Sequence, residues 1–122
     1  NTKLSGLVTG DSYILFKDKT DYKKRLATGK LSKDGHPSFS KVNEDLMITD
    51  TYPNIDDNYK EELILYNLYN GEKKSELKLN HVPEFAIGGN RCDLHPKWSH
   101  DGQYVSIDTL DKGYRSIYIY DV

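Results

Sequence analysis

Six polar side chains are the candidates for chemistry in this sequence of 122 residues. They are two histidines, one arginine and three aspartates: His36, His95, Arg91, Asp50, Asp93 and Asp108. Imidazole and carboxylate groups together suit a divalent ion such as Mn²⁺ or Mg²⁺. A guanidinium group binds a carboxylate through two parallel hydrogen bonds. These residue types therefore predict a site for a divalent metal or a sugar acid.

The two histidines occupy equivalent positions of an internal repeat. Gly35–Ser40 matches Leu94–Ser99, because both copies read x-His-Pro-x-aromatic-Ser. After a turn, each copy continues into a short apolar strand that ends in Asp-Thr, and then into a third strand. These later matches are Asp50-Thr51 with Asp108-Thr109, and Glu62–Leu68 with Ser116–Val122. Since only the loop lengths differ, we interpret the two copies as one repeated structural unit.

The elements that carry these residues are predicted to be β-strands. The apolar runs are short, and the dipeptides Asn70-Gly71 and Asp101-Gly102 favour tight hairpins. Because a repeated antiparallel unit buries both faces by stacking on its neighbours, we expect an all-β fold of consecutive four-stranded β-propeller blades. A plain antiparallel sandwich is the alternative. The expected divisions are a partial blade at 1–34, a blade at 35–80 whose outer strand is Lys73–Leu79, and a last blade at 81–122 that lacks its outer strand.

Propeller topology predicts where the six side chains lie. The loop before the innermost strand and the loop after the second strand share one face of a propeller, so all six side chains are expected at one rim of the channel. A structural role is the alternative for the histidines and for the Asp-Thr pairs, which commonly tie strands to turns. We expect His81 and His100 to face solvent and Cys92 to be buried. Trp98 and Phe39 are expected in the core.

The second copy of the repeat, His95–Val105, resembles the blades of TolB-like (PD40) propellers, whose motif has a Trp-Ser pair followed by Asp-Gly. His100 replaces the usual proline, and the first copy lacks the Asp-Gly turn. The wider pattern, His36-Pro37 with Asp50–Pro53 and Arg91–Pro96, is similar to the propellers of oligogalacturonate-lyase-like bacterial proteins. This resemblance covers residues 35–122. It implies a saccharide-associated propeller with His36 and His95 as metal ligands.

The resemblance also implies a reaction. Oligogalacturonate lyases cleave pectic oligosaccharides by β-elimination with the help of a divalent metal. The metal would stabilise the enolate that forms when the proton α to the carboxylate is lost, and a basic side chain would take that proton. We therefore expect Arg91 as the catalytic residue and Asp50, Asp93 and Asp108 as substrate-binding residues. The histidine expected two residues before His95 in a lyase is Asp93 here, and this difference favours the alternative of a non-catalytic glycan- or protein-binding scaffold.

Composition limits the other possibilities. The formal charge of −2 argues against a nucleic-acid-binding domain, and no apolar run is long enough to span a membrane. The single cysteine allows no internal disulfide. The sequence begins at Asn1, so we expect a processed product or an excised piece of a larger protein, which joins further blades or self-associates. The compartment stays open, and cytoplasmic is favoured over periplasmic. The acidic pairs Asp56-Asp57 and Glu61-Glu62 are expected in a solvated loop.

Overall fold

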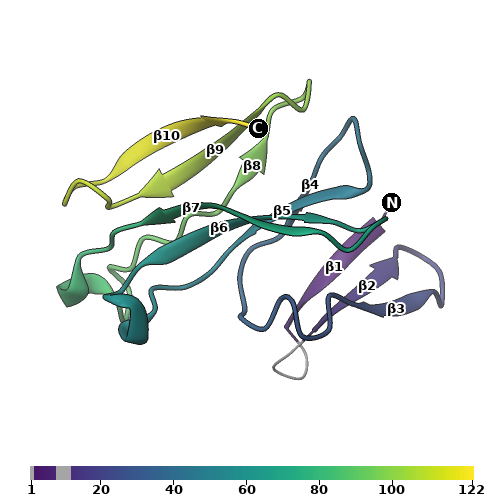
Figure 1. The fold of residues 1–122 in the computed structure, drawn as a ribbon, viewed down its shortest axis with the longest axis horizontal. Helices are drawn as coiled ribbons and strands as arrows, with labels where there is room; N and C mark the ends of the chain where they lie inside the picture. Colours follow the sequence, from purple (N-terminus) through teal and green to yellow (C-terminus); the bar gives the residue numbers. More distant parts are fainter. Residues whose placement is uncertain (1, 8–11) are drawn as a thin grey trace. The chain divides into compact units, whose positions relative to one another are not determined.

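The chain forms antiparallel β-sheets joined by turns (Figure 1). The structure is a computed structural model that describes residues 2–7 and 12–122. These residues contain no α-helix, only two short 3₁₀ helices, η1 (Ile55–Asp57) and η2 (Pro83–Phe85). The predicted all-β class is therefore confirmed. Within the same residues, no helix has the length and apolar character needed to cross a membrane.

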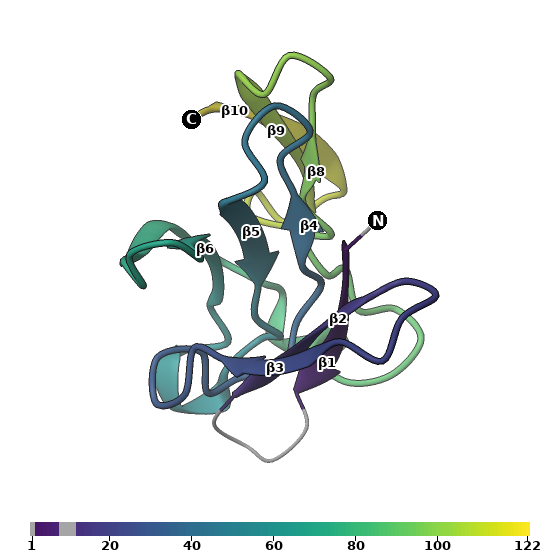
Figure 2. The ribbon, with the colours of Figure 1, turned by 90° about the vertical axis from the view of Figure 1, so that its right-hand side faces the viewer.

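The first of two compact units comprises Asn1–Gly35. Its strands β1 (Thr2–Leu7), β2 (Tyr13–Lys17) and β3 (Lys23–Leu26) lie in that order in one sheet (Figure 1). Figure 2 shows the same three strands after a turn of 90°. Tyr13 is fully buried, and its hydroxyl donates a hydrogen bond to the Lys33 carbonyl at 3.1 Å. The first three residues of β3 are exposed, which agrees with the solvated edge expected for a strand that begins with three basic residues.

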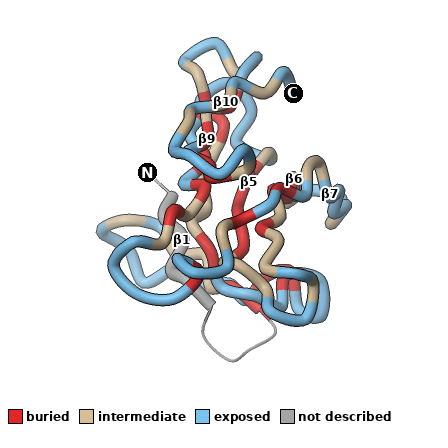
Figure 3. Tube along the Cα trace, turned by 90° about the vertical axis from the view of Figure 1, so that its left-hand side faces the viewer, coloured by how far each residue is buried: buried red, intermediate tan, exposed pale blue. Residues whose placement is uncertain are grey.

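The second unit, His36–Val122, contains two further sheets. Four strands follow one another in the first sheet: β4 (Ser38–Phe39), β5 (Leu46–Asp50), β6 (Glu61–Asn67) and β7 (Lys73–Leu79). The second sheet has three: β8 (Lys97–Trp98), β9 (Tyr104–Thr109) and β10 (Ser116–Asp121). The strands predicted from the apolar runs are present, and so is the outer strand Lys73–Leu79 that was expected after the Asn70-Gly71 turn. Figure 3 shows buried residues along both β5 and β9.

The two sheets of this unit have matching register. In the first sheet Asp50 pairs with Leu63 and Ile48 pairs with Leu65. In the second sheet the residues at the repeat offsets pair in the same way: Asp108 with Ile117, and Ser106 with Ile119. The repeat found in the sequence therefore corresponds to the same strand pairing in both sheets.

The repeated serine has the same backbone role in each sheet. The Ser40 amide donates to the Leu46 carbonyl at 2.9 Å, and the Ser99 amide donates to the Tyr104 carbonyl at 2.8 Å. Each hydroxyl accepts hydrogen bonds from backbone amides of its own turn: Ser40 Oγ from Val42 and Asn43, Ser99 Oγ from Tyr104. These bonds close the turn between the first two strands of each sheet.

The core of the second unit lies between its two sheets. Its buried residues come from both sheets and from the segment before β8: Ile48, Leu63, Leu79, Leu94, Trp98, Val105 and Ile107. Trp98 also joins the sheets by a polar contact, because its indole N–H donates to the Ser38 carbonyl at 3.0 Å. The prediction for Trp98 is confirmed, whereas Phe39 is only half-buried. Phe39 is part of β4, which is two residues long and lies at the edge of its sheet. The sheet therefore covers little of the Phe39 ring.

Candidate functional site

Three of the predicted residues bring their polar atoms together in the second unit. One potential ligand atom from each of His36, Asp93 and His95 lies within 4.8 Å of the other two. The His36 and His95 rings are 3.9 Å apart between centroids and tilted by 46°. Each histidine stands two residues before a short first strand, β4 or β8, so the repeat itself brings the two imidazoles side by side.

Asp50 fixes the backbone on which both histidines stand. Its fully buried carboxylate accepts hydrogen bonds from the His36 amide at 2.6 Å and from the His95 amide at 2.9 Å. His36 Nδ1 also lies 3.1 Å from both Asp50 oxygens. Because an ionised carboxylate only accepts, the proton is on Nδ1, and the lone pair of His36 Nε2 is available for a ligand.

This position favours the structural alternative for Asp50. A carboxylate with no exposed surface, already engaged by three donor groups, does not reach a dissolved substrate. Its role is to hold the first strands of the two sheets at a fixed distance. Asp50 therefore positions the site.

His95 has an unusual backbone conformation. Its φ is +43°, in the left-handed region that few residues other than glycine adopt. The hydrogen bond from its amide to Asp50 holds it there. Its side chain is exposed beside that of His36, which is one-third exposed. Residues held in such conformations by their surroundings concentrate at functional sites.

Arg91 forms an ion pair with Asp93. Its Nε and one terminal nitrogen donate to the two Asp93 oxygens at 2.6 and 3.0 Å. Its guanidinium carbon lies 4.3 Å from the centre of the Tyr52 ring, a cation–π contact. The hydrogen bond to Asp93 raises the pKa of Arg91 above its ordinary value. Arg91 is thus a permanent cation that orients the Asp93 carboxylate.

Glu61 is a member of the site that the sequence did not predict. It was expected in a solvated loop, and this is wrong, because Glu61 begins β6 and is fully buried. Neither carboxylate oxygen has a hydrogen-bond partner among the described residues. Burial, and next the charges of Asp93 and Asp50, raise its pKa from 4.5 to about 9, against the opposing effect of Arg91. Glu61 therefore carries a proton at neutral pH.

The strand periodicity was the signal that could have placed Glu61. In β6 the side chains of Glu61 and Leu63 point to the same side, because residues two apart share a face of a strand. Leu63 lies in the predicted strand Glu62–Leu68 and is fully buried. Starting the strand one residue earlier would have placed Glu61 beside it, on the inner face.

Asp108 lies outside this cluster. It is exposed in β9 and lines a pocket of about 230 Å³ together with Cys92, Arg115, Ser116 and Ile117. Its backbone amide donates to the Leu94 carbonyl at 2.9 Å. Although Asp108 is the repeat equivalent of Asp50, its carboxylate does not share the ligand cluster of His36, Asp93 and His95.

His81 was expected to face solvent, and this is wrong. It is buried, its Nε2 accepts the Cys92 amide at 3.2 Å, and its Nδ1 lies 2.9 Å from the Val82 carbonyl. These two contacts fix a neutral tautomer with the proton on Nδ1. His81 thereby anchors the segment that carries Arg91 and Asp93. The expected burial of Cys92 is confirmed, and His100 is exposed as predicted.

The donor set fits a divalent ion. Two imidazoles and one carboxylate are ligands that Mn²⁺ and related ions accept. At metal–ligand distances of about 2.0–2.2 Å, two donors are at most about 4.4 Å apart, so small side-chain rotations would complete such a site. The buried Asp50 behind His36 is the kind of second partner that metal-binding histidines usually have.

No protein-family model, curated protein or solved structure matches this chain.

Proposed function

We propose that this chain is part of a β-propeller that binds a divalent metal ion and uronate oligosaccharides, in the manner of the oligogalacturonate-lyase-like proteins. The observation that carries the proposal is the convergence of His36, Asp93 and His95. These three residues belong to the histidine-proline segments on which the resemblance to that family rests. Because their side chains lie close together, the residues of this sequence pattern could bind one metal ion.

The propeller part of the proposal is supported by the repeated register. Two successive antiparallel sheets with the same strand pairing, the same serine-closed turn and the same aspartate position are what consecutive blades would have. The two sheets also pack face to face through a shared apolar core. A sandwich would not require its two sheets to repeat in this way.

Each residue of the site has a distinct task in this proposal. The metal, held by His36, Asp93 and His95, would stabilise the negative charge that develops when the proton α to a uronate carboxylate is removed. Asp50 keeps the two histidine backbones in place, and Arg91 keeps the Asp93 carboxylate oriented. Tyr52 lines the same site against Arg91 and the His36 ring.

Metal titration tests the proposal. We expect calorimetry to show Mn²⁺ binding to the intact chain, and no binding to the double variant His36→Ala, His95→Ala. His100→Ala is the matched control, because it removes an exposed imidazole outside the cluster and should bind Mn²⁺ like the original chain. An intact chain without affinity for Mn²⁺ would overturn the proposal.

The second candidate is a non-catalytic propeller scaffold that binds a glycan or a protein. The Arg91–Asp93 pair favours it, because a guanidinium engaged by a carboxylate and held protonated is not available to accept a proton. Absorbance of the unsaturated product, followed after mixing the Mn²⁺-loaded chain with oligogalacturonides, separates the candidates. Product formation supports the lyase-like reaction, and metal binding without product supports the scaffold.

A further inference from the structure

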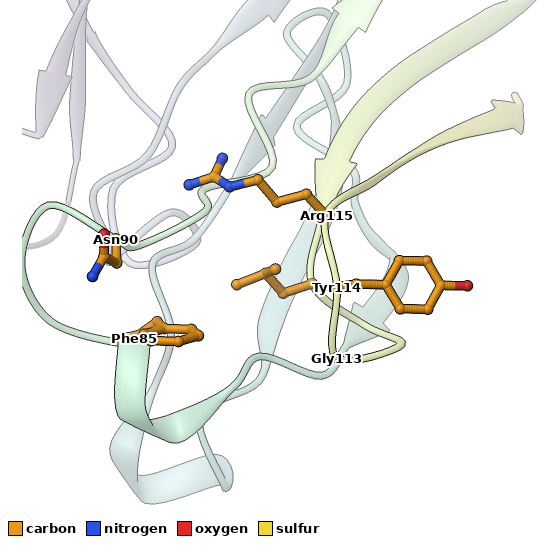
Figure 4. A pocket seen from close by; sticks show the side chains of 6 residues that line it. Phe85, Asn90, Gly113, Tyr114 and Arg115 are labelled. Atoms are coloured by element: carbon orange, nitrogen blue, oxygen red, sulfur yellow. The ribbon is translucent and has the colours of Figure 1, made fainter.

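A second pocket lies beside the loops that carry the candidate metal site. It has a volume of about 370 Å³, in the range of small-ligand sites. Its walls come from η2, from the segment before β8 and from the turn between β9 and β10. Phe85, Asn90, Leu110 and Arg115 supply its side chains, and the buried Leu110 closes it toward the core. In Figure 4 the side chains of Phe85, Asn90 and Arg115 lie around the same space, whereas the Tyr114 ring points away from it.

Arg115 is the feature that gives this pocket its chemistry. Among the residues that the structure describes, its guanidinium has no hydrogen bond or ion pair. Arg91, in contrast, donates two hydrogen bonds to Asp93, from Nε and from one terminal nitrogen. A free guanidinium at the wall of a concave site is suited to a carboxylate, which it binds through two parallel hydrogen bonds.

The other side chains suit a sugar ring rather than a simple anion. Phe85 is 37% exposed, and its ring offers an apolar surface to the C–H face of a pyranose. The Asn90 amide supplies a donor and an acceptor for hydroxyl groups. The pocket therefore combines one cation, one aromatic surface and one amide, which matches the three kinds of group on a hexuronate.

One segment, residues 90–95, links the pocket to the candidate metal site, because its residues alternate between the two. In this segment the odd-numbered residues belong to the metal site: Asp93 and His95 are candidate ligands, and Arg91 binds Asp93. The even-numbered Asn90 lines this pocket, and Cys92 lines the pocket of about 230 Å³. Arg115 lines both pockets.

We infer that this pocket is a subsite for one hexuronate ring, with its carboxylate on Arg115, its apolar face on Phe85 and a hydroxyl on Asn90. The choice of a sugar acid rests on the proposed function, but the Arg115 anion site does not depend on the metal. The subsite assigns the carboxylate-binding role to Arg115 instead of Arg91.

Protein-observed NMR titration with galacturonate and with galactose tests this inference. We expect galacturonate to shift the resonances of Phe85, Asn90 and Arg115, and galactose to bind at least about tenfold more weakly, because it lacks the carboxylate. Arg115→Gln should weaken galacturonate binding about tenfold or more, the usual effect of losing a charge-assisted hydrogen-bond pair. Lys112→Gln is the control, since it removes one positive charge from the same turn without touching the pocket.

The outcomes distinguish the subsite from the metal site. Galacturonate binding that persists in Arg115→Gln, or equal binding of galactose, would overturn the subsite. Arg115-dependent binding of galacturonate in a chain that has no Mn²⁺ affinity would sustain the subsite and overturn the proposed function. Mn²⁺ affinity should be the same in Arg115→Gln as in the original chain.

Discussion

Two buried carboxylates with opposite environments define the site at the scale of single residues. The Asp50 carboxylate accepts hydrogen bonds from two backbone amides and lies within hydrogen-bond distance of one imidazole. Glu61 has no such donors, and it lies near two other carboxylates that raise its pKa. Asp50 therefore holds the backbone of the site through its hydrogen bonds, whereas Glu61 is a protonated, neutral carboxylic acid.

The protonated Glu61 predicts a stability that falls as pH rises. Its pKa is 4.5 when exposed and about 9 in the folded chain, so unfolding releases a proton between these values. The stabilisation is complete below pH 4.5 and is lost progressively up to about pH 9, by up to about 3 kcal/mol between pH 4.5 and 7. Urea denaturation of Glu61→Gln across pH 5–8 should show that this dependence has disappeared.

Glu44→Gln provides the comparison for this experiment. Glu44 is exposed, so its replacement should leave the pH dependence of the unfolding free energy as it is in the original chain. Parallel pH profiles for the original chain and Glu61→Gln would show that Glu61 is ionised in the folded state.

At the scale of elements, the two sheets of the second unit depend on Trp98. Its ring belongs to the core between the sheets, and its N–H reaches the Ser38 carbonyl at the start of the other sheet. β4 and β8 are each two residues long, so few backbone hydrogen bonds hold these first strands. Side-chain packing at Trp98 takes over part of that role.

Replacing Trp98 separates packing from hydrogen bonding. Trp98→Ala should lower the free energy of unfolding by roughly 3–5 kcal/mol, as truncation of a large buried aromatic residue does. Trp98→Phe keeps most of the packing and loses the bond to Ser38, so we expect a loss of about 1–2 kcal/mol. Chemical denaturation measures both, and an unfolding midpoint for Trp98→Ala equal to that of the original chain would contradict this packing.

The sequence predicted the strands well and the environments of the acidic residues less well. Short apolar runs and the Asn-Gly and Asp-Gly turns mark strands through local chemistry alone. β5, β6, β9 and β10 lie at these runs, and β7 follows the Asn70-Gly71 turn as the expected outer strand. Burial of Glu61 depends on the face that it occupies, which a shift of one residue reverses. Asp50 and Asp108 are identical in the repeat, yet one is buried and the other exposed, because burial also depends on neighbouring segments.

At the scale of the whole molecule, the repeat leaves one apolar face uncovered. Leu63 on β6 is fully buried in the core between the sheets, whereas its repeat equivalent Ile117 on β10 is 69% exposed. Ile119, on the same face, is 66% exposed. β10 is also the edge strand of its sheet, so its backbone can pair with another strand. Because Leu63 is covered by a neighbouring sheet, we propose that a sheet of the same kind also packs on Ile117 and Ile119.

A second copy of the chain is the occupant that we expect in a solution of the pure chain. Light scattering should show dimers or larger species whose fraction grows with concentration. Ile117→Lys, Ile119→Lys should reduce this association, whereas Tyr69→Lys, at a still more exposed position in the turn after β6, should not. A stable monomer at all concentrations would contradict the stacked arrangement and favour a sandwich.

The most direct measurement of the metal site is pulsed electron paramagnetic resonance on the Mn²⁺-loaded chain. Nitrogen nuclei of directly bound imidazoles modulate the electron spin echo of Mn²⁺, so the spectrum identifies the ligands. We expect couplings from two imidazole nitrogens, a reduction to one in His36→Ala or His95→Ala, and both couplings in His100→Ala. Mn²⁺ without nitrogen couplings, or couplings that persist in the His36→Ala, His95→Ala double variant, would show that these histidines are not the ligands.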